Sequence, residues 1–301
     1  MDTLCALTGQ HFIIPFYHIV SDEDCPHIRN LYRYKNTTEF IRDIDYLATH
    51  YHSIGASDLN DVLAGKYAGK KIMLLTFDDG LRQMYDIVAP ILLKKGIPAV
   101  FFLNTDFIDN KGLMFRYKAS LIKDMDKDTS AMFMARNDAE LQEEIRPSLA
   151  MEIQNEINTF LSDYKPYMTI DQVKGLTKQG FAIGAHSCSH PYYSDLSLGN
   201  QLSETLECID ILKTDFGIAQ KLFAFPFTDD GVSKDFFDKI FEGGKVDFSF
   251  GGAGIKEDMH PRQFQRMPME GWDASAEQIL KSEYLYYVLR MPFAKNRIKR
   301  G

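Results

Sequence analysis

The sequence contains few of the residues that build thiolate metal sites or disulfide frameworks. Its four cysteines, Cys5, Cys25, Cys188 and Cys208, include no Cys-x-x-Cys pair, so any metal site here is expected to use imidazole and carboxylate ligands. It also lacks the apolar run of ~18 to 20 residues that a membrane-spanning helix needs. No basic segment precedes the first apolar run, so we predict no signal peptide. Because cysteines without export signals are expected to be reduced, we predict a cytoplasmic protein.

An excess of positive charge is missing as well. The chain has 34 basic and 42 acidic side chains, for a net charge of −8, and this balance argues against a protein that binds nucleic acid. Its 301 residues, 45% of them hydrophobic and 25% charged, have the composition of a globular protein rather than of a disordered chain or a coiled coil. One barrel-sized domain is therefore expected.

Nearly all-apolar segments alternate with helical patterns along the chain. Residues 71–77 and 98–103 are apolar on both faces and are separated by a helical pattern over 81–95, which is typical of strands in a parallel sheet or barrel. A polar, largely helical stretch at about 106–167 interrupts this alternation, and its residues 139–161 predict one long helix. We therefore predict a single domain over 1–301 of the α/β class. It is a distorted, incomplete (β/α) barrel of about seven strands with a helical insertion.

Two adjacent carboxylates follow one of the predicted strands. The segment Thr76-Phe-Asp-Asp-Gly80 places Asp78 and Asp79 at the carboxyl end of an apolar run, where active sites of such barrels lie. A solvent-exposed turn would explain the pair equally well by itself, because Asp-Asp-Gly is a common turn sequence.

Two histidines follow another predicted strand. His186 and His190, in His-Ser-Cys-Ser-His, have a spacing that brings two imidazoles to one side of a helical turn. Two unrelated loop histidines are the simpler alternative. With Asp79 at the end of a parallel strand, however, the set predicts an open catalytic metal site of two imidazoles and one carboxylate.

These two motifs resemble those of the NodB-type polysaccharide deacetylases, carbohydrate esterase family 4. Thr76 to Gly80 matches the first motif of that family without change, His186 to His190 matches the second, and the similarity extends over about residues 12–280. The resemblance implies that Asp78 is the general base and that Asp79, His186 and His190 bind a divalent metal. Zn²⁺ is the first choice, with Co²⁺ or another transition metal as the alternative.

The sequence departs from the family pattern at the third motif. Alanine occupies position 224 in Ala-Phe-Pro-Phe227, where many members have the arginine that orients the base. We expect Arg266 to supply this charge from another strand, although a surface ion pair is the simpler explanation for it. The backbone N–H of Phe227 is the expected donor to the oxyanion.

A second departure concerns the general acid. The late histidine motif of many members does not occur after residue 227, where His260 is the sole histidine. The segment Phe16-Tyr-His18 instead resembles the arrangement in deacetylases of poly-N-acetylglucosamine, in which the acid comes from the first strand. His18 is therefore the predicted acid, against the alternative of a structural histidine at a strand end.

Two features lie outside these motifs. Trp272, the one tryptophan, is a candidate for stacking on a sugar, although a packing role is equally expected. The tail 291–301 and Arg290 before it are basic and contain no acid. This run predicts either a solvated tail or a peripheral contact with the inner face of a membrane.

The predicted function is removal of N-acetyl groups, with O-acetyl groups as the alternative, from a carbohydrate in cell-surface polysaccharide or lipid-linked glycan metabolism. The predicted partner is thus an acetylated sugar or glycan. Three other hypotheses stay open: a metal-dependent amidohydrolase of a small non-sugar amide, a catalytically weak glycan-binding homologue, and a structural barrel without a site.

Overall fold

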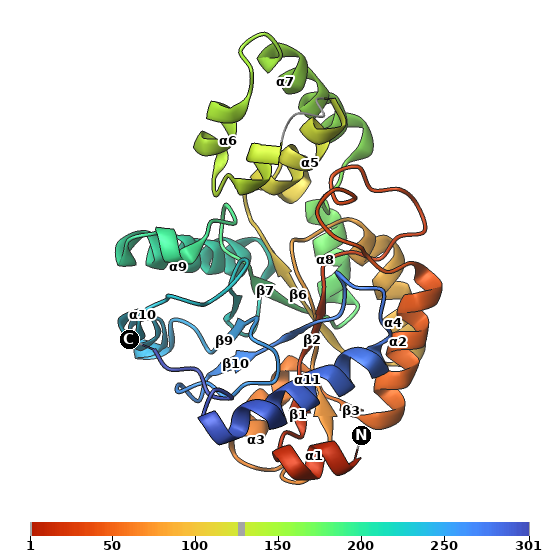
Figure 1. Cartoon of the computed structure of the whole chain (residues 1–301), viewed down its shortest axis with the longest axis vertical. Coiled ribbons are helices and arrows are strands. Elements are labelled where there is room, and N and C mark those ends of the chain that lie inside the picture. Colours follow the sequence, from red (N-terminus) through yellow and green to blue (C-terminus); the bar gives the residue numbers. More distant parts are fainter. Residues whose placement is uncertain (1, 126–129, 301) are drawn as a thin grey trace.

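Parallel strands form the centre of the computed structural model, which describes residues 2–125 and 130–300 (Figure 1). Strands that are covered on both faces consist of short apolar runs, because neither face meets water. The strands of the larger sheet are β2 (Pro15–Tyr17), β5 (Leu75–Phe77), β6 (Ala99–Leu103), β7 (Ala182–Ala185), β8 (Leu222–Ala224), β9 (Phe248–Gly251), β10 (Gln263–Gln265) and β11 (Met267–Pro268). Their order is β10-β9-β8-β7-β6-β5-β2-β11, with all pairings parallel.

The barrel closes where one continuous stretch of chain changes its partner strand. β10 pairs with β9, whereas β11, one residue later, pairs with β2 at the opposite end of the sheet. Because β10 and β11 belong to one stretch, the eight strands fill seven positions around the barrel. Arg266 lies between β10 and β11, where the partner strand changes. The predicted distorted (β/α) barrel of about seven strands is confirmed, and the barrel is more nearly closed than expected.

A second, three-stranded sheet extends the barrel at one end. It consists of β1 (Phe12–Ile13), β4 (Ile72–Met73) and β3 (His52–Ser53) in the order β1-β4-β3, again with parallel pairings. β1 leads into β2 and β4 leads into β5, each across one residue. The two sheets therefore share two stretches of chain.

Helices cover the barrel, as the alternation of strand and helix patterns predicts. α2 (Thr37–His50) begins after the N-cap Asn36, which forms a capping box with Glu39. Its buried residues Phe40, Ile44 and Leu47 face the core. The other helices on the barrel are α1 (Asp2–Thr8), α3 (Leu59–Leu63), α4 (Ala89–Lys95), α8 (Ile170–Lys178), α9 (Leu198–Phe216), α10 (Lys234–Phe241) and α11 (Ala276–Arg290).

The helices between β6 and α8 form a layer that stands on one end of the barrel (Figure 1). Its helices include α5 (Phe115–Met125), α6 (Asp138–Glu144) and α7 (Ala150–Thr159). The single long helix expected over 139–161 is therefore wrong. Pro147 lies between α6 and α7, and a proline disfavours helical backbone at the residue before it and removes a helical N–H.

The basic tail packs against the body of the protein. Arg297 pairs with Glu257 at 2.8 Å, and Arg300, with a side chain only 4% exposed, pairs with both Asp229 and Asp258. Two of the tail's cations are thus neutralised by acids, which reduces the charge available to an anionic membrane. Within the described residues, no helix has the length and apolar character needed to cross a bilayer.

Candidate active site

The adjacent carboxylates Asp78 and Asp79 lie where β5 ends and the chain turns. Asp79 has φ 69° and Gly80 has φ 67°, a left-handed backbone that glycine adopts without cost and that aspartate tolerates better than most residues. A Cβ at position 80 would also lie 3.1 Å from the Leu103 side chain. The turn interrupts the alternation of the strand, so both carboxylates line one cavity, where they are 2% and 3% exposed.

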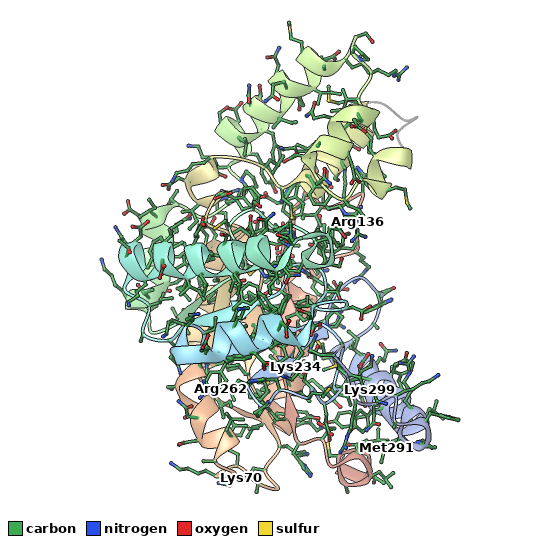
Figure 2. The ribbon with its side chains drawn as sticks, turned by 90° about the vertical axis from the view of Figure 1, so that its left-hand side faces the viewer. Lys70, Arg136, Lys234, Arg262, Met291 and Lys299 are labelled. Atoms are coloured by element: carbon green, nitrogen blue, oxygen red, sulfur yellow. The ribbon has the colours of Figure 1, made fainter. Side chains whose placement is uncertain are left out.

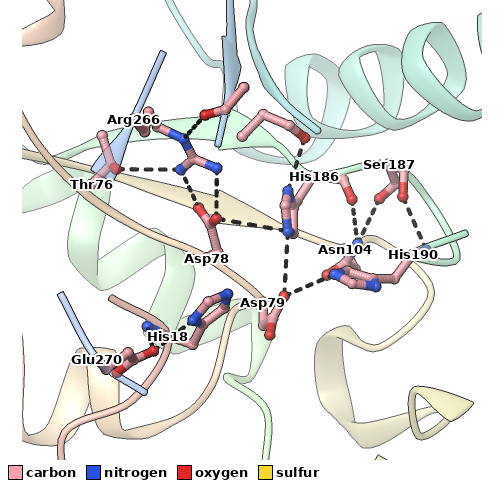
Figure 3. Close-up of polar contacts among 12 residues, drawn as sticks. His18, Thr76, Asp78, Asp79, Asn104, His186, Ser187, His190, Arg266 and Glu270 are labelled. Atoms are coloured by element: carbon pink, nitrogen blue, oxygen red, sulfur yellow. Dashed lines mark hydrogen bonds and ion pairs between the residues drawn. The ribbon is translucent and has the colours of Figure 1, made fainter. Parts of the chain in front are cut away.

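Asp78 forms a bidentate ion pair with Arg266. Arg266 Nη1 and Nη2 donate to the two carboxylate oxygens at 2.7 Å each, and the two side chains are almost fully buried (Figure 3). The guanidinium also lies 4.5 Å from the ring of Phe16. Burial alone would raise the pKa of Asp78, but the charge of Arg266 holds this pKa below its ordinary value. Asp78 is therefore kept ionised inside the protein.

Asp79, His186 and His190 form a compact cluster on the same wall. Their candidate ligand atoms all lie within 4.8 Å of one another, and Asp79 Oδ1 is 3.3 Å from His186 Nε2 and 3.2 Å from His190 Nε2. His186 Nδ1 donates to the carbonyl of Ala224 at 2.8 Å, which leaves the lone pair on Nε2 facing the cluster. Burial lowers the pKa of His190, which favours the neutral imidazole that binds metal.

These residues fit a divalent transition metal. Asp79 Oδ1 is buried and accepts no hydrogen bond from the described residues, an arrangement that is costly unless another group neutralises the oxygen. Two imidazole nitrogens and one carboxylate oxygen also form the donor set of open catalytic sites for zinc and related metals.

The two histidines are brought together by a loop instead of the expected helical turn. Ser187 has φ 67° and His190 has φ 62°, and residues 186–190 form no helix. Asn104, which follows β6, donates to the carbonyls of His186 and Ser187. Ser187 Oγ in turn accepts the N–H of His190 at 2.9 Å. Local polar contacts thus hold a backbone that helical spacing alone does not predict.

His18 lies at the end of β2 and faces the same cavity. Its Nδ1 is 2.5 Å from Glu270 Oε1, and its backbone N–H donates to the same oxygen at 2.6 Å (Figure 3). Burial lowers the pKa of His18, but the hydrogen bond to Glu270 and the charges of Asp79, Glu270 and Asp78 outweigh it and raise the pKa to about 9. His18 is therefore a protonated imidazolium at neutral pH.

Phe227 and Trp272 lie in different surroundings. Phe227 lines the cavity with φ 54°, and its ring meets the His190 ring edge-on at 4.5 Å and stacks on Tyr192 at 3.9 Å. Trp272 is 55% exposed and is not among the residues that line the cavity. Its backbone carbonyl accepts a hydrogen bond from Arg33. A role for Trp272 in sugar binding stays a prediction.

Glu270 and Tyr117 contact the predicted site residues and were missed by the sequence analysis. Glu270 lies just after β11 and directly before Gly271, which has φ 93°. Asp79 and Gly80 show the same pattern of an acidic residue followed by a glycine with positive φ after a strand. That pattern was a usable signal. Tyr117 comes from α5 in the insertion, and its hydroxyl donates to Asp79 Oδ2 at 2.5 Å. No sequence feature distinguishes it from other tyrosines.

Comparison with protein families identifies the chain. The family model described as polysaccharide deacetylase matches residues 65–238, more than half of the sequence and including both motifs. This chain belongs to the polysaccharide deacetylase family. The resemblance seen in its motifs is thereby confirmed, while a search of curated proteins returns no match to this family member.

Solved structures share the fold of this polysaccharide deacetylase family member at low sequence identity. IcaB from Ammonifex degensii has a TM-score of 0.62 and 18% identity, over 92% of this chain and 98% of IcaB. The deacetylase PplD of Streptococcus pyogenes, solved with acetate, has a TM-score of 0.60 and 16% identity, over 90% and 97% of the two chains. A de-N-acetylase from Aggregatibacter actinomycetemcomitans has a TM-score of 0.54 and 15% identity, over 85% and 94%.

Proposed function

We propose that this protein is a metal-dependent hydrolase that removes N-acetyl groups from a carbohydrate. The observation that carries the proposal is the meeting of three units in one cavity of about 530 Å³. These units are an ionised Asp78 held by Arg266, a cluster of metal-type ligands, and a protonated His18 held by Glu270. Two ionisable groups kept in opposite protonation states are what an acid–base hydrolysis requires.

Asp79, His186 and His190 would hold the divalent metal, with zinc as the first choice. When bound, such an ion supplies polarisation of the acetyl carbonyl and a lowered pKa for water. Asp78 then acts as the general base, and its carboxylate accepts the proton that water loses as the oxygen of water bonds to the acetyl carbon. Arg266 keeps Asp78 ionised for this step and fixes both of its oxygens.

His18 acts as the general acid. The carbon–nitrogen bond breaks only when the departing amine receives a proton, because an amide anion is a very poor leaving group. The raised pKa of His18 keeps a proton on the imidazole at neutral pH, and Glu270 orients the ring through Nδ1. The products are acetate and a free sugar amine, and the backbone N–H of Phe227 is the proposed donor to the oxyanion.

Acetate release from a panel of N-acetylhexosamines, with Zn²⁺ or Co²⁺ added, tests this function. Asp78→Asn should retain metal but lose at least roughly a hundredfold in kcat, whereas Asp230→Asn, at an exposed acid outside the cavity, serves as the matched control. Turnover of O-acetyl sugars or of small non-sugar amides in preference to N-acetyl sugars would overturn the substrate assignment. Binding of glycans without acetate release would indicate a glycan-binding homologue.

A further inference from the structure

Arg116 is a cation on the wall of the cavity that the proposed mechanism does not use. It belongs to α5 of the insertion and lines the cavity together with Asp79 and His190. Its Nη2 donates to the hydroxyl of Tyr192 at 2.9 Å, and its Nη1 donates to the carbonyl of Phe133. Both partners are neutral, so the positive charge of Arg116 is not balanced by them.

The other cations that line the cavity have carboxylate partners. Arg266 pairs with Asp78, and His18 pairs with Glu270. Across residues 2–125 and 130–300, in contrast, no carboxylate forms an ion pair with Arg116. A guanidinium has five N–H donors, and the hydrogen bonds to described residues use two of the five.

Apolar and aromatic side chains surround this charge. Arg116 Cζ lies 5.8 Å from the ring of Phe115 and 6.0 Å from the ring of Phe227, and Met114 and Phe133 also line the cavity. A charge beside such groups attracts an opposite charge more strongly than it would in water. An anion that enters the cavity therefore meets a positive charge at Arg116 that no carboxylate of the described residues balances.

Phe227 links Arg116 to the metal-type cluster. The centroid of the Phe227 ring is 4.5 Å from that of His190 and 6.0 Å from Arg116 Cζ. One aromatic ring is therefore close both to the guanidinium and to a proposed metal ligand. The cavity is large enough for a substituted sugar. One sugar ring can therefore present its acetamido group to the cluster and a second substituent to Arg116.

We propose that Arg116 binds an oxyanion, a carboxylate or a phosphate, on the sugar from which the acetyl group is removed. This inference rests on the proposed deacetylase function and names its substrate class. A planar guanidinium with free N–H groups matches the two oxygens of either anion in a forked arrangement. The cavity thus selects an anionic N-acetyl sugar over a neutral one.

The test compares kcat/KM for three substrates: neutral N-acetylglucosamine, its phosphate monoester, and its uronic acid, which carries a carboxylate. The two anionic compounds distinguish the two sources of the oxyanion. Wild type should prefer at least one of them, and Arg116→Gln should lower the ratio of anionic to neutral kcat/KM by roughly ten- to a hundredfold. Arg116→Lys should retain part of the preference, because lysine keeps the charge without the fork.

Arg136→Gln is the matched control. Arg136 also comes from the insertion and packs on Tyr192, at 4.0 Å, but it pairs with Asp195 and does not line the cavity. Figure 2 shows it where the helical layer meets the barrel. Its substitution should leave the anionic-to-neutral ratio unchanged. An equal loss on all three substrates in Arg116→Gln would assign Arg116 a structural role and overturn the inference.

Binding measured without turnover separates failure of this inference from failure of the proposed function. Calorimetry with the phosphate monoester should give weaker binding to Arg116→Gln than to wild type, and the wild-type affinity should fall as salt is added. Turnover of sugars with no anionic preference refutes the inference and leaves the function standing. Binding that depends on Arg116 without any acetate release refutes the function and supports the anion site.

Discussion

Glu270→Gln is the substitution that tests the proposed acid most directly. Glu270 accepts from both the ring and the backbone of His18, and the pKa of His18 rises from its ordinary 6.5 to about 9 in this environment. The difference corresponds to roughly 3 kcal/mol in favour of the charged imidazole. Glutamine preserves the shape of the site but removes the negative charge. The hydrogen bond to Glu270 is the largest of the effects that raise this pKa, whereas the charges of Asp79 and Asp78 remain in the variant. We therefore expect the variant pKa to fall from about 9 toward its ordinary 6.5.

The expected effect on catalysis depends on pH. A histidine with a pKa of about 9 is about 90% protonated at pH 8, whereas one with a pKa of about 6.5 is about 3% protonated. The kcat/KM of Glu270→Gln should therefore fall below wild type at pH 8 through loss of protonated acid, by up to roughly thirtyfold. At pH 6 this contribution is small. The alkaline limb of the pH–rate profile should move to lower pH.

The stability of the folded protein should also depend on the charge of His18, and therefore on pH. Since the folded-state pKa of His18 is raised, its contribution to stability is complete below pH 6.5 and is lost as the pH rises through about 9. The difference in unfolding free energy between wild type and Glu270→Gln should shrink over that window. Glu257→Gln, which removes an acid paired with Arg297 outside the cavity, is the control. A loss of activity in Glu270→Gln that is the same at pH 6 and pH 8 would refute the role of His18 as acid.

Three further predictions concern other parts of the molecule. Arg266→Met leaves the buried Asp78 unpaired, so urea unfolding should show a loss of about 3–5 kcal/mol in the free energy of unfolding. Adding Asp78→Asn to this variant should restore part of the loss, and equal stability of the single and double variants would contradict the prediction. His190→Ala should abolish Zn²⁺ retention in calorimetry, whereas His52→Ala, on β3 away from the cluster, should not. If the C-terminal region contacts a membrane, Leu289→Ser with Phe293→Ser, at residues 71% and 72% exposed, should reduce co-sedimentation with anionic vesicles. Unchanged sedimentation of this double variant would argue against a membrane contact. Deletion of the tail is a less suitable test, because it would leave Asp229 and Asp258 without their ion-pair partner Arg300.

The parts of the fold that follow from local pattern were predictable. Apolar runs on both faces predicted the parallel strands, and the barrel follows from their alternation with helices. The closure at Arg266 was not predictable, because it depends on which strands pair across the whole chain and no local signal encodes that pairing. The break between α6 and α7 was predictable from Pro147, because a proline disfavours helical backbone at the residue before it.

The residues of the site also divide into those that local sequence patterns predict and those that they do not. Asp78, Asp79, His186 and His190 lie in short motifs next to strand ends, and these motifs nominate them through their resemblance to those of the family. Tyr117 and Arg116 come from the insertion, whose position over the barrel is a tertiary fact that no local pattern states. The residues that the sequence leaves unassigned are thus the ones that shape the cavity around the cluster.

Arg266 joins the closure of the barrel to the ion pair with Asp78, the proposed base. The chain changes partner strand at this residue: Arg266 N–H donates to Gly251 on β9, and the next N–H, that of Met267, donates to Ile14 beside β2. A side chain at the point where the barrel closes is carried inward, and it meets Asp78 at the end of β5, next to β2 in the sheet. In many relatives the arginine is expected on the strand that here ends in Ala224, whose carbonyl instead holds His186. In this chain the charge that keeps Asp78 ionised therefore comes from the segment that completes the barrel, so disturbing that segment should reduce stability and activity together.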